Sequence, residues 1–241
     1  MPNSRPPRGA APASLQAIIF DFDGVIANSE PLHLRAFQDT LAEAGMLLTS
    51  ADYYARYLGF DDVGLFEAVG RDLGQPMDEG RVRDLVDRKA ARMRELLESG
   101  SVLFPGAADF IRQSAVRVPV AVASGALRPE IEAILGAAKL LSLFPVIVAA
   151  GDTPRSKPSP EPYRLAFRRL SEGNGGGLDP ARCVAIEDSR WGLQSARGAG
   201  LRSVGVTTSY PAAELGDADL VVGGLGDLTI EALDELCSQP A

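Results

Sequence analysis

Residues Ile18–Glu30 read IIFDFDGVIANSE, an apolar run that ends in two aspartates with one residue between them and a glycine directly after. The run Leu15–Phe20 is short, apolar and bounded by polar residues, which predicts a buried β-strand. Asp21 and Asp23 follow this strand. Two carboxylates this close disfavour each other's ionisation. Their pairing therefore indicates a nearby cation or a shared chemical task.

Five further apolar runs have the same character and predict five more strands. These runs lack polar alternation, which is typical of strands covered on both faces of a parallel sheet. They are Pro119–Ser124, Phe144–Ala150, Cys183–Asp188, Arg202–Thr208 and Asp219–Gly224. Helical patterns, such as those over residues 128–140 and 159–170, separate the runs. This alternation predicts an α/β fold with a doubly wound, Rossmann-like parallel-sheet core.

Residues 31–100 differ from the rest because they contain no convincing strand pattern. The stretch from Gly80 to Gly100 is an amphipathic helix, and Glu30–Gly45 forms a second helical pattern. We therefore expect a helical domain at 31–100, inserted into a core formed by residues 15–30 and 101–236. Residues 1–14 are rich in Pro, Ala and Arg, without the apolar segment of a signal peptide, and predict a disordered tail.

The composition limits the possible partners and the compartment. The chain has 241 residues, a formal net charge of −8 and a pI near 4.8. This charge argues against a general nucleic-acid binder, which needs a basic surface. No apolar run approaches the roughly 20 residues of a membrane span. The cysteines, Cys183 and Cys237, form neither a metal motif nor a disulfide framework. Because disulfide frameworks belong to oxidising compartments, we expect a cytoplasmic protein. We also expect a monomer.

Polar residues follow several of the predicted strands at the point where each strand ends. They are Asp21, Asp23, Ser124, Gly125, Lys157, Glu187 and Asp188. The carboxyl ends of parallel strands meet at one edge of the sheet, where ligands bind. Carboxylate oxygens are typical ligands of Mg²⁺, and a lysine with a serine–glycine turn suits phosphate. A carboxylate can also attack phosphorus to form an aspartyl-phosphate. The pattern predicts Mg²⁺-assisted phosphoryl chemistry.

Four motifs carry a resemblance to a known family: DFDGVIANSEPLH, VASG, SKPSP and IEDS. In this order and at strand ends, they resemble the signature motifs of haloacid dehalogenase-type (HAD) phosphatases and phosphomutases, within them the β-phosphoglucomutase-like proteins. The resemblance covers about residues 15–236. It implies that the helical domain is a cap, that Asp21 is the nucleophile and that Asp23 is the general acid and base.

The same resemblance assigns the binding residues. Ser124, with Gly125, and Lys157 would hold the phosphoryl group. Asp188 would bind Mg²⁺, with Glu187 either ligating the metal or supporting it. Asp21 would supply a side-chain oxygen to the metal and Asp23 a backbone carbonyl.

Two departures from the mutase pattern favour a phosphatase that acts on a small phosphorylated metabolite such as a sugar phosphate. The chain carries Asn28-Ser29 where the mutases carry Asp-Thr, and Leu127-Arg128 where they carry Lys-Asn. A β-phosphoglucomutase-type isomerase stays an alternative. A receiver-like phospho-accepting module is a remote one, because receivers are about half this length and lack a helical insertion.

Three further residues are candidates for contacts with the substrate or the cap. They are His33, Arg56 and Arg128. His33 is the only histidine and can equally be a helix-surface or hinge residue. In the mutases a histidine at this place lies near the active site.

Overall fold

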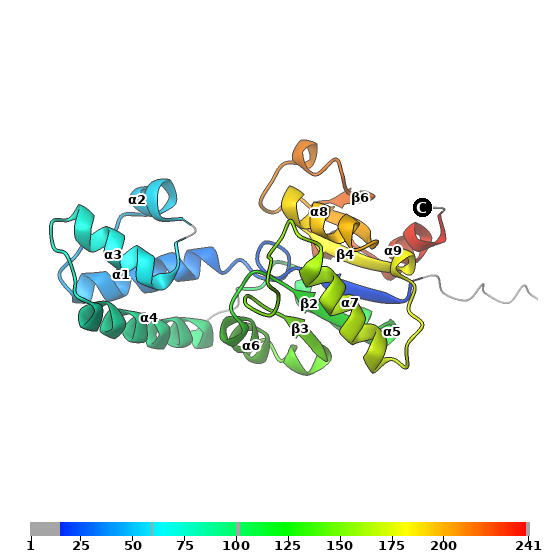
Figure 1. The fold of residues 1–241 in the computed structure, drawn as a ribbon, viewed down its shortest axis with the longest axis horizontal. Coiled ribbons are helices and arrows are strands. Elements are labelled where there is room, and N and C mark those ends of the chain that lie inside the picture. The colour runs from blue at the N-terminus through cyan, green and yellow to red at the C-terminus, as the bar shows by residue number, and fades with distance from the viewer. Residues whose placement is uncertain (1–14, 59, 100–101, 240–241) are drawn as a thin grey trace, which may run out of the picture. The chain divides into compact units, whose positions relative to one another are not determined.

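The computed structural model describes residues 15–58, 60–99 and 102–239. The predicted tail at residues 1–14 and the predicted boundary at 100–101 lie outside these ranges. A parallel sheet of six strands forms the centre of one unit, in the order β3-β2-β1-β4-β5-β6 (Figure 1). The strands are β1 (Ala17–Phe20), β2 (Val120–Ala123), β3 (Val146–Val148), β4 (Cys183–Glu187), β5 (Arg202–Val206) and β6 (Leu220–Val222). Each falls within a predicted run, and the predicted α/β class is confirmed.

The strand order explains where a ligand can bind. The chain runs outward from β1 through β2 to β3, then returns to β4 on the other side of β1 and continues outward to β6. Ile19 of β1 lies beside Ala121 of β2 and Ala185 of β4. The connection after β1 leads to one side of the sheet and the connection after β4 leads to the other side. Such a switch point leaves a crevice at the carboxyl ends of the two strands. Asp21 and Glu187 both lie there.

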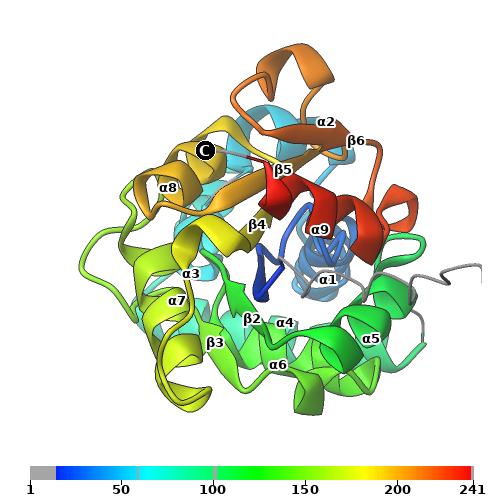
Figure 2. The ribbon, with the colours of Figure 1, turned by 90° about the vertical axis from the view of Figure 1, so that its right-hand side faces the viewer.

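Helices cover both faces of the sheet. Figure 2 shows α7 and α8 on one side and α5 and α9 on the other. On the α7 side, small and branched strand side chains such as Ala185 pack with Tyr163, Ala166 and Leu170 of α7. On the other side, the ring of Phe20 meets that of Phe110 of α5 edge to face, with centroids 6.2 Å apart. The helices that lie wholly in this unit are α5 (Ala107–Arg117), α7 (Glu161–Gly173), α8 (Arg190–Gly198) and α9 (Ile230–Ser238), and α6 (Arg128–Ala137) begins in it.

The second unit is helical and has its own apolar core. Its elements are α1 (Glu30–Glu43), α2 (Ser50–Asp52), a π-helical turn at Tyr53–Tyr57, α3 (Asp62–Asp72) and α4 (Glu79–Ser99). Val82 and Leu85 on the apolar face of α4 join Phe37, Leu41 and Phe66 in the core. The described residues between 31 and 100 include no strand. Within the described chain, no helix is both long and apolar enough to cross a membrane.

The boundaries between the two compact units fall at Ile26/Ala27 and at Leu103/Phe104, and residues Ala133–Ala138 group with the helical unit. The two connecting segments pair with each other. Ala27 and Leu103 form an isolated antiparallel bridge, and the amide of Asn28 donates to the carbonyl of Val102 over 2.8 Å. The independence of the two units as domains stays a prediction.

Candidate active site

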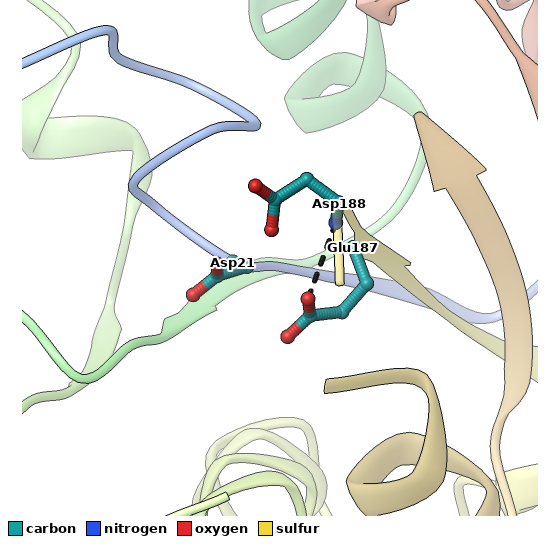
Figure 3. A group of neighbouring side chains, drawn as sticks. All are labelled: Asp21, Glu187 and Asp188. Carbon is teal, nitrogen blue, oxygen red and sulfur yellow. Dashed lines mark hydrogen bonds between the residues drawn. The ribbon is translucent and has the colours of Figure 1, made fainter. Parts of the chain in front are cut away.

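Three carboxylates meet at the carboxyl ends of β1 and β4. Asp21 follows β1, and its amide donates a 2.9 Å hydrogen bond to the carbonyl of Ile186 on β4. Glu187 ends β4 and Asp188 follows it. One oxygen from each of Asp21, Glu187 and Asp188 lies within 4.8 Å of the others, and all three residues are buried (Figure 3). Hard oxygen ligands at this spacing suit a divalent cation such as Mg²⁺.

Lys157 contributes the positive charge of the site. Its Nζ lies 2.7 Å from Oδ1 of Asp21 and 2.5 Å from Oε1 of Glu187. Burial by itself would lower the pKa of Lys157, but the charges of Asp21 and Glu187 raise it above its usual value. The ammonium group therefore stays protonated and neutralises part of the carboxylate charge.

Burial, rather than the ion pair, decides the protonation of Asp21. It raises the pKa of Asp21 well above the usual value; Lys157 opposes this effect, while the charges of Glu187 and Asp188 add to it. A cation placed among the three carboxylates would remove this repulsion.

Glu187 is fully buried and accepts hydrogen bonds on both carboxylate oxygens. Oε1 accepts from Lys157 and, over 3.0 Å, from the hydroxyl of Tyr163 on α7. Oε2 accepts from the amides of Asp188 and Ser189 and from the Ser189 hydroxyl. The first turn of α8 also closes on this group, since a Cβ at Gly192 would lie 1.8 Å from Cδ of Glu187. The surroundings therefore hold Glu187 in a single orientation.

Asp188 lies against the backbone of Gly24. A Cβ built on Gly24 would lie 1.9 Å from Oδ2 of Asp188, and the φ of Gly24 is +80°. Both facts require glycine at this position. Burial raises the pKa of Asp188 to about 6, although a hydrogen bond from Ser209 lowers it.

Asp23 is half-buried in the turn between Asp21 and Gly24. Its carboxylate does not belong to the group of three described above. The expected metal contact of Asp23 is through its backbone carbonyl, and its roles as acid, base and ligand stay predictions.

The predicted phosphate-binding residues line one cavity of the sheet unit. A cavity of about 240 Å³ brings Ser124 and Gly125, after β2, beside Lys157. Ser124 is buried, and its Oγ accepts a 3.0 Å hydrogen bond from the amide of Ala126, which shapes the turn. Gly151, Thr153 and Ser156 from the loop after β3 also line the cavity. Ala149, Ala150 and Pro162 complete the lining, most of whose surface is apolar, and Lys157 links the cavity to the carboxylates.

Each of the three candidate contact residues has partners within its own unit. In the helical unit, Nδ1 of His33 lies 2.9 Å from Nζ of the buried Lys89, and Arg56 pairs with Asp72. In the sheet unit, Arg128 donates to the carboxylate of Asp152 and to the carbonyl of Ile147. Roles of these three in substrate binding stay predictions.

Comparison with known proteins gives the family. The family model of haloacid dehalogenase-like hydrolases matches residues 15–200, which include all four motifs and the acidic cluster. The chain belongs to the haloacid dehalogenase-like hydrolase family. This confirms the predicted family.

Named relatives support the enzyme class of this HAD-like hydrolase. It is 33% identical to Protein CbbY of Rhodobacter capsulatus, over 92% of this chain and 99% of that protein. It is 30% identical to Hexitol phosphatase B of Escherichia coli, over 95% and 98% of the two chains. The crystal structure of a point mutant of CbbY from Rhodobacter sphaeroides, in complex with xylulose-(1,5)-bisphosphate, is similar with a TM-score of 0.67 and 31% identity, over 89% and 96%. The prediction of an HAD-type phosphatase is confirmed.

Sequence reasoning missed three residues that contact the acidic cluster. They are Tyr163, Gly192 and Ser209. Gly192 could have been noticed in the sequence, because a glycine in the first turn of a helix lowers helix stability and therefore suggests a close packing contact. Tyr163 and Ser209 come from a helix and a loop whose local patterns say nothing about Glu187 or Asp188.

Proposed function

We propose that this HAD-like hydrolase is a Mg²⁺-dependent phosphomonoesterase that acts on a small phosphorylated metabolite, a sugar phosphate, through an aspartyl-phosphate on Asp21. The observation that carries the proposal is the meeting of Asp21, Lys157, Glu187 and Asp188 at one end of the sheet, beside the cavity that contains Ser124. A nucleophile, a cationic group and a neighbouring cavity with a hydroxyl and backbone amides for the phosphoryl oxygens are the parts that phosphoryl transfer needs.

The charge balance supports a resident divalent cation. With all three carboxylates ionised, the single ammonium of Lys157 would leave an excess of two negative charges in a buried space. Asp21 and Asp188 would ligate Mg²⁺ through side-chain oxygens and Asp23 through its carbonyl. Glu187 already accepts five hydrogen bonds, which favours a role in holding its neighbours rather than in direct ligation. Mg²⁺ would supply neutralisation of charge on the phosphoryl oxygens.

In the first step, an oxygen of Asp21 attacks phosphorus and the bond from phosphorus to the leaving alcohol breaks. Lys157, whose Nζ is 2.7 Å from Oδ1 of Asp21, stabilises the negative charge that spreads over the phosphoryl oxygens. Ser124 and the backbone at Gly125 orient the same oxygens. Because these groups are held in place and partly shielded from water, their charges and dipoles stabilise the transition state strongly.

Asp23 completes the cycle as acid and then base. It donates a proton to the leaving alcohol, which leaves it able to take a proton from the water that hydrolyses the aspartyl-phosphate. Its position two residues after Asp21, on the turn that Gly24 permits, allows it to reach the side of the phosphoryl group opposite the nucleophile.

Relatives support a sugar phosphate as the substrate. One is named as a phosphatase of hexitols, and the CbbY structure holds a pentulose bisphosphate. The first name refers to a six-carbon polyol, and the second compound is a five-carbon ketose with two phosphate esters. We propose a substrate of the same chemical class, a phosphorylated polyol or sugar of five or six carbons.

A β-phosphoglucomutase-type activity is the alternative, and two features favour the phosphatase over it. Leu127 occupies one of the positions where the mutases grip phosphate. Arg128, at the other, has its guanidinium already engaged by Asp152 and Ile147.

The experiment is a screen of the purified chain against phosphorylated sugars, polyols and other metabolites, read as free phosphate with Mg²⁺ or with excess chelator. We expect release from one or a few sugar or polyol phosphates that stops in chelator. Unchanged release in chelator would remove the metal from the mechanism. Isomerisation of a sugar 1-phosphate that requires a bisphosphorylated sugar, without phosphate release, would establish the mutase instead.

A further inference from the structure

The loop after β5, residues 207–210, contacts the acidic site at two points. Oγ of Ser209 lies beside the carboxylate of Asp188 and lowers the pKa of that group. Its neighbour Thr208 donates through Oγ1 to the backbone carbonyl of Gly24. The loop therefore connects the turn after β1 with the end of β4, which are the two segments that supply the carboxylates.

The same contacts restrict the orientation of Asp188. A Cβ at Gly24 would lie 1.9 Å from Oδ2 of Asp188 and 2.8 Å from Oγ of Ser209, so the carboxylate, the hydroxyl and the Gly24 backbone crowd around one point. A carboxylate with backbone on one side and a hydroxyl donor beside it has few rotamers left. An oxygen of this carboxylate lies with those of Asp21 and Glu187.

An aromatic pair attaches the loop to α8. The ring of Tyr210 meets the ring of Trp191 edge to face, with centroids 6.1 Å apart and an interplanar angle of 74°. Trp191 is the second residue of α8, three residues after Asp188, and the guanidinium of Arg190 lies 4.4 Å from the centroid of its indole. Edge-to-face pairs have a preferred geometry and resist separation. Because Ser209 is itself exposed to solvent, its hydroxyl needs this support to hold a fixed position.

We propose that Ser209 is a positioning residue that orients Asp188 toward the divalent cation, and that the Trp191–Tyr210 ring pair holds the 207–210 loop in place for this task. The inference rests on the proposed function, because it concerns the cation that Asp188 would bind. Partners that hydrogen bond to metal-binding carboxylates preorganise them, and their loss costs affinity for the metal even though they never touch it.

The first test measures metal binding without any substrate. Mn²⁺, which replaces Mg²⁺ at oxygen sites, is titrated into the full chain and its free fraction is followed by electron paramagnetic resonance. Ser209→Ala is compared with Ser203→Ala. Ser203 is a matched control because its hydroxyl also bonds a carboxylate, that of Asp219, from β5 itself but away from the site. We expect Ser209→Ala to weaken binding about 10-fold, and Ser203→Ala to bind as the wild type does.

The second test concerns the ring pair. Tyr210→Phe keeps the ring and removes only the hydroxyl, whereas Tyr210→Ala removes the pair. We expect Tyr210→Ala to weaken Mn²⁺ binding in the same direction as Ser209→Ala, and Tyr210→Phe to retain the affinity of the wild type. Trp191 is the only tryptophan of the chain. Its fluorescence should therefore change as the wild type binds Mg²⁺, with the same midpoint that activity shows.

Catalysis gives a third readout. A positioning role through the cation predicts that Ser209→Ala loses activity at low Mg²⁺ and recovers the kcat of the wild type at saturating Mg²⁺. Equal Mn²⁺ affinities for Ser209→Ala, Ser203→Ala and the wild type would overturn the positioning role and leave the proposed function intact. A wild-type chain that binds no Mn²⁺ would overturn the metal assignment, and the positioning role with it.

Discussion

The hydroxyl of Tyr163 lies 3.0 Å from Oε1 of Glu187, and both side chains are fully buried. Burial raises the pKa of Tyr163 well above its usual value, and the charge of Glu187 adds to the effect. The phenol is therefore a permanent donor to the carboxylate. Together with Lys157, it holds the oxygen of Glu187 that faces α7.

Tyr163→Phe should lower the free energy of unfolding by roughly 1.5–3 kcal/mol, because a buried carboxylate loses a hydrogen bond. Chemical denaturation measures this change. Tyr54→Phe is the control, since that ring is half exposed in the helical unit. Equal stability of the two variants would show that the Tyr163 hydroxyl contributes nothing to the fold.

Gly24→Ala should abolish most activity, since the new methyl group collides with Oδ2 of Asp188. Gly45→Ala is a matched control: its φ is +77°, close to the +80° of Gly24, but nothing lies within 4 Å of its Cβ position. The control should lose only about 1 kcal/mol of stability through backbone strain. Phosphate release and thermal unfolding are measured for both variants. A loss that occurs only in Gly24→Ala is due to the collision with Asp188, and a loss common to both is due to backbone strain. Similar activities would mean that the contact with Asp188 is unimportant.

Asp21→Asn should abolish turnover, because an amide cannot attack phosphorus. The fold should survive, and in chelator the thermal midpoint should be no lower than that of the wild type. The reason is that the substitution removes a buried carboxylate that Glu187 and Asp188 repel. Steady-state phosphate release and thermal unfolding test both statements. Retained activity would disprove the assignment of the nucleophile.

Asp23→Asn should slow the second step more than the first when the substrate is an aryl phosphate, because such a leaving group needs little protonation. We expect a burst of about one phenolate per active site, followed by slow turnover. Phosphate should accumulate on the protein, visible by mass spectrometry as a gain of one phosphoryl group. Asp21→Asn, as the control, should show neither burst nor mass gain. Near-normal turnover without a burst would move the acid–base role elsewhere, with His33 the next candidate.

Asp39→Asn tests an ion pair inside the helical unit. Asp39 of α1 lies 2.9 Å from Nε of Arg35 and 2.8 Å from Nη2 of Arg92 on α4. Partial burial would raise the pKa of Asp39, but hydrogen bonds from Arg92 and Arg35 lower it overall. A carboxyl whose pKa is lower in the folded state stabilises that state above its unfolded pKa, and this stabilisation is lost as the pH falls through the folded pKa.

The wild type should therefore exceed Asp39→Asn in unfolding free energy by up to about 1 kcal/mol at neutral pH. The difference should shrink as the pH falls below about 4. Denaturation followed by helical circular dichroism at several pH values measures it. A difference that is independent of pH would attribute the effect to packing instead of charge.

The sequence alone was sufficient to predict the α/β fold and to predict that carboxylates and a lysine gather at one edge of the sheet. Apolar runs without polar alternation identified the strands, because a parallel sheet buries both faces and needs apolar side chains along each strand. Asp21, Glu187 and Asp188 were singled out because a polar residue at the end of a buried strand is a local feature of the sequence. Lys157 lies in the SKPSP motif of the loop that follows β3. The bond between Lys157 and Asp21 joins residues 136 positions apart, yet the strand pattern predicted their proximity.

Only the tertiary structure decided which residues support these four. Tyr163 lies in the first turn of α7, where an aromatic residue is typical of ordinary packing. Its hydroxyl meets Glu187 only because α7 packs against β2 and β3 and also contacts β1. Ser209 follows β5, a neighbour of β4 in space although not a predicted part of the site. The sequence also did not show that Asp152 and the Ile147 carbonyl engage the guanidinium of Arg128. The packing of segments that are distant in the sequence determines these contacts, and local residue patterns do not predict that packing.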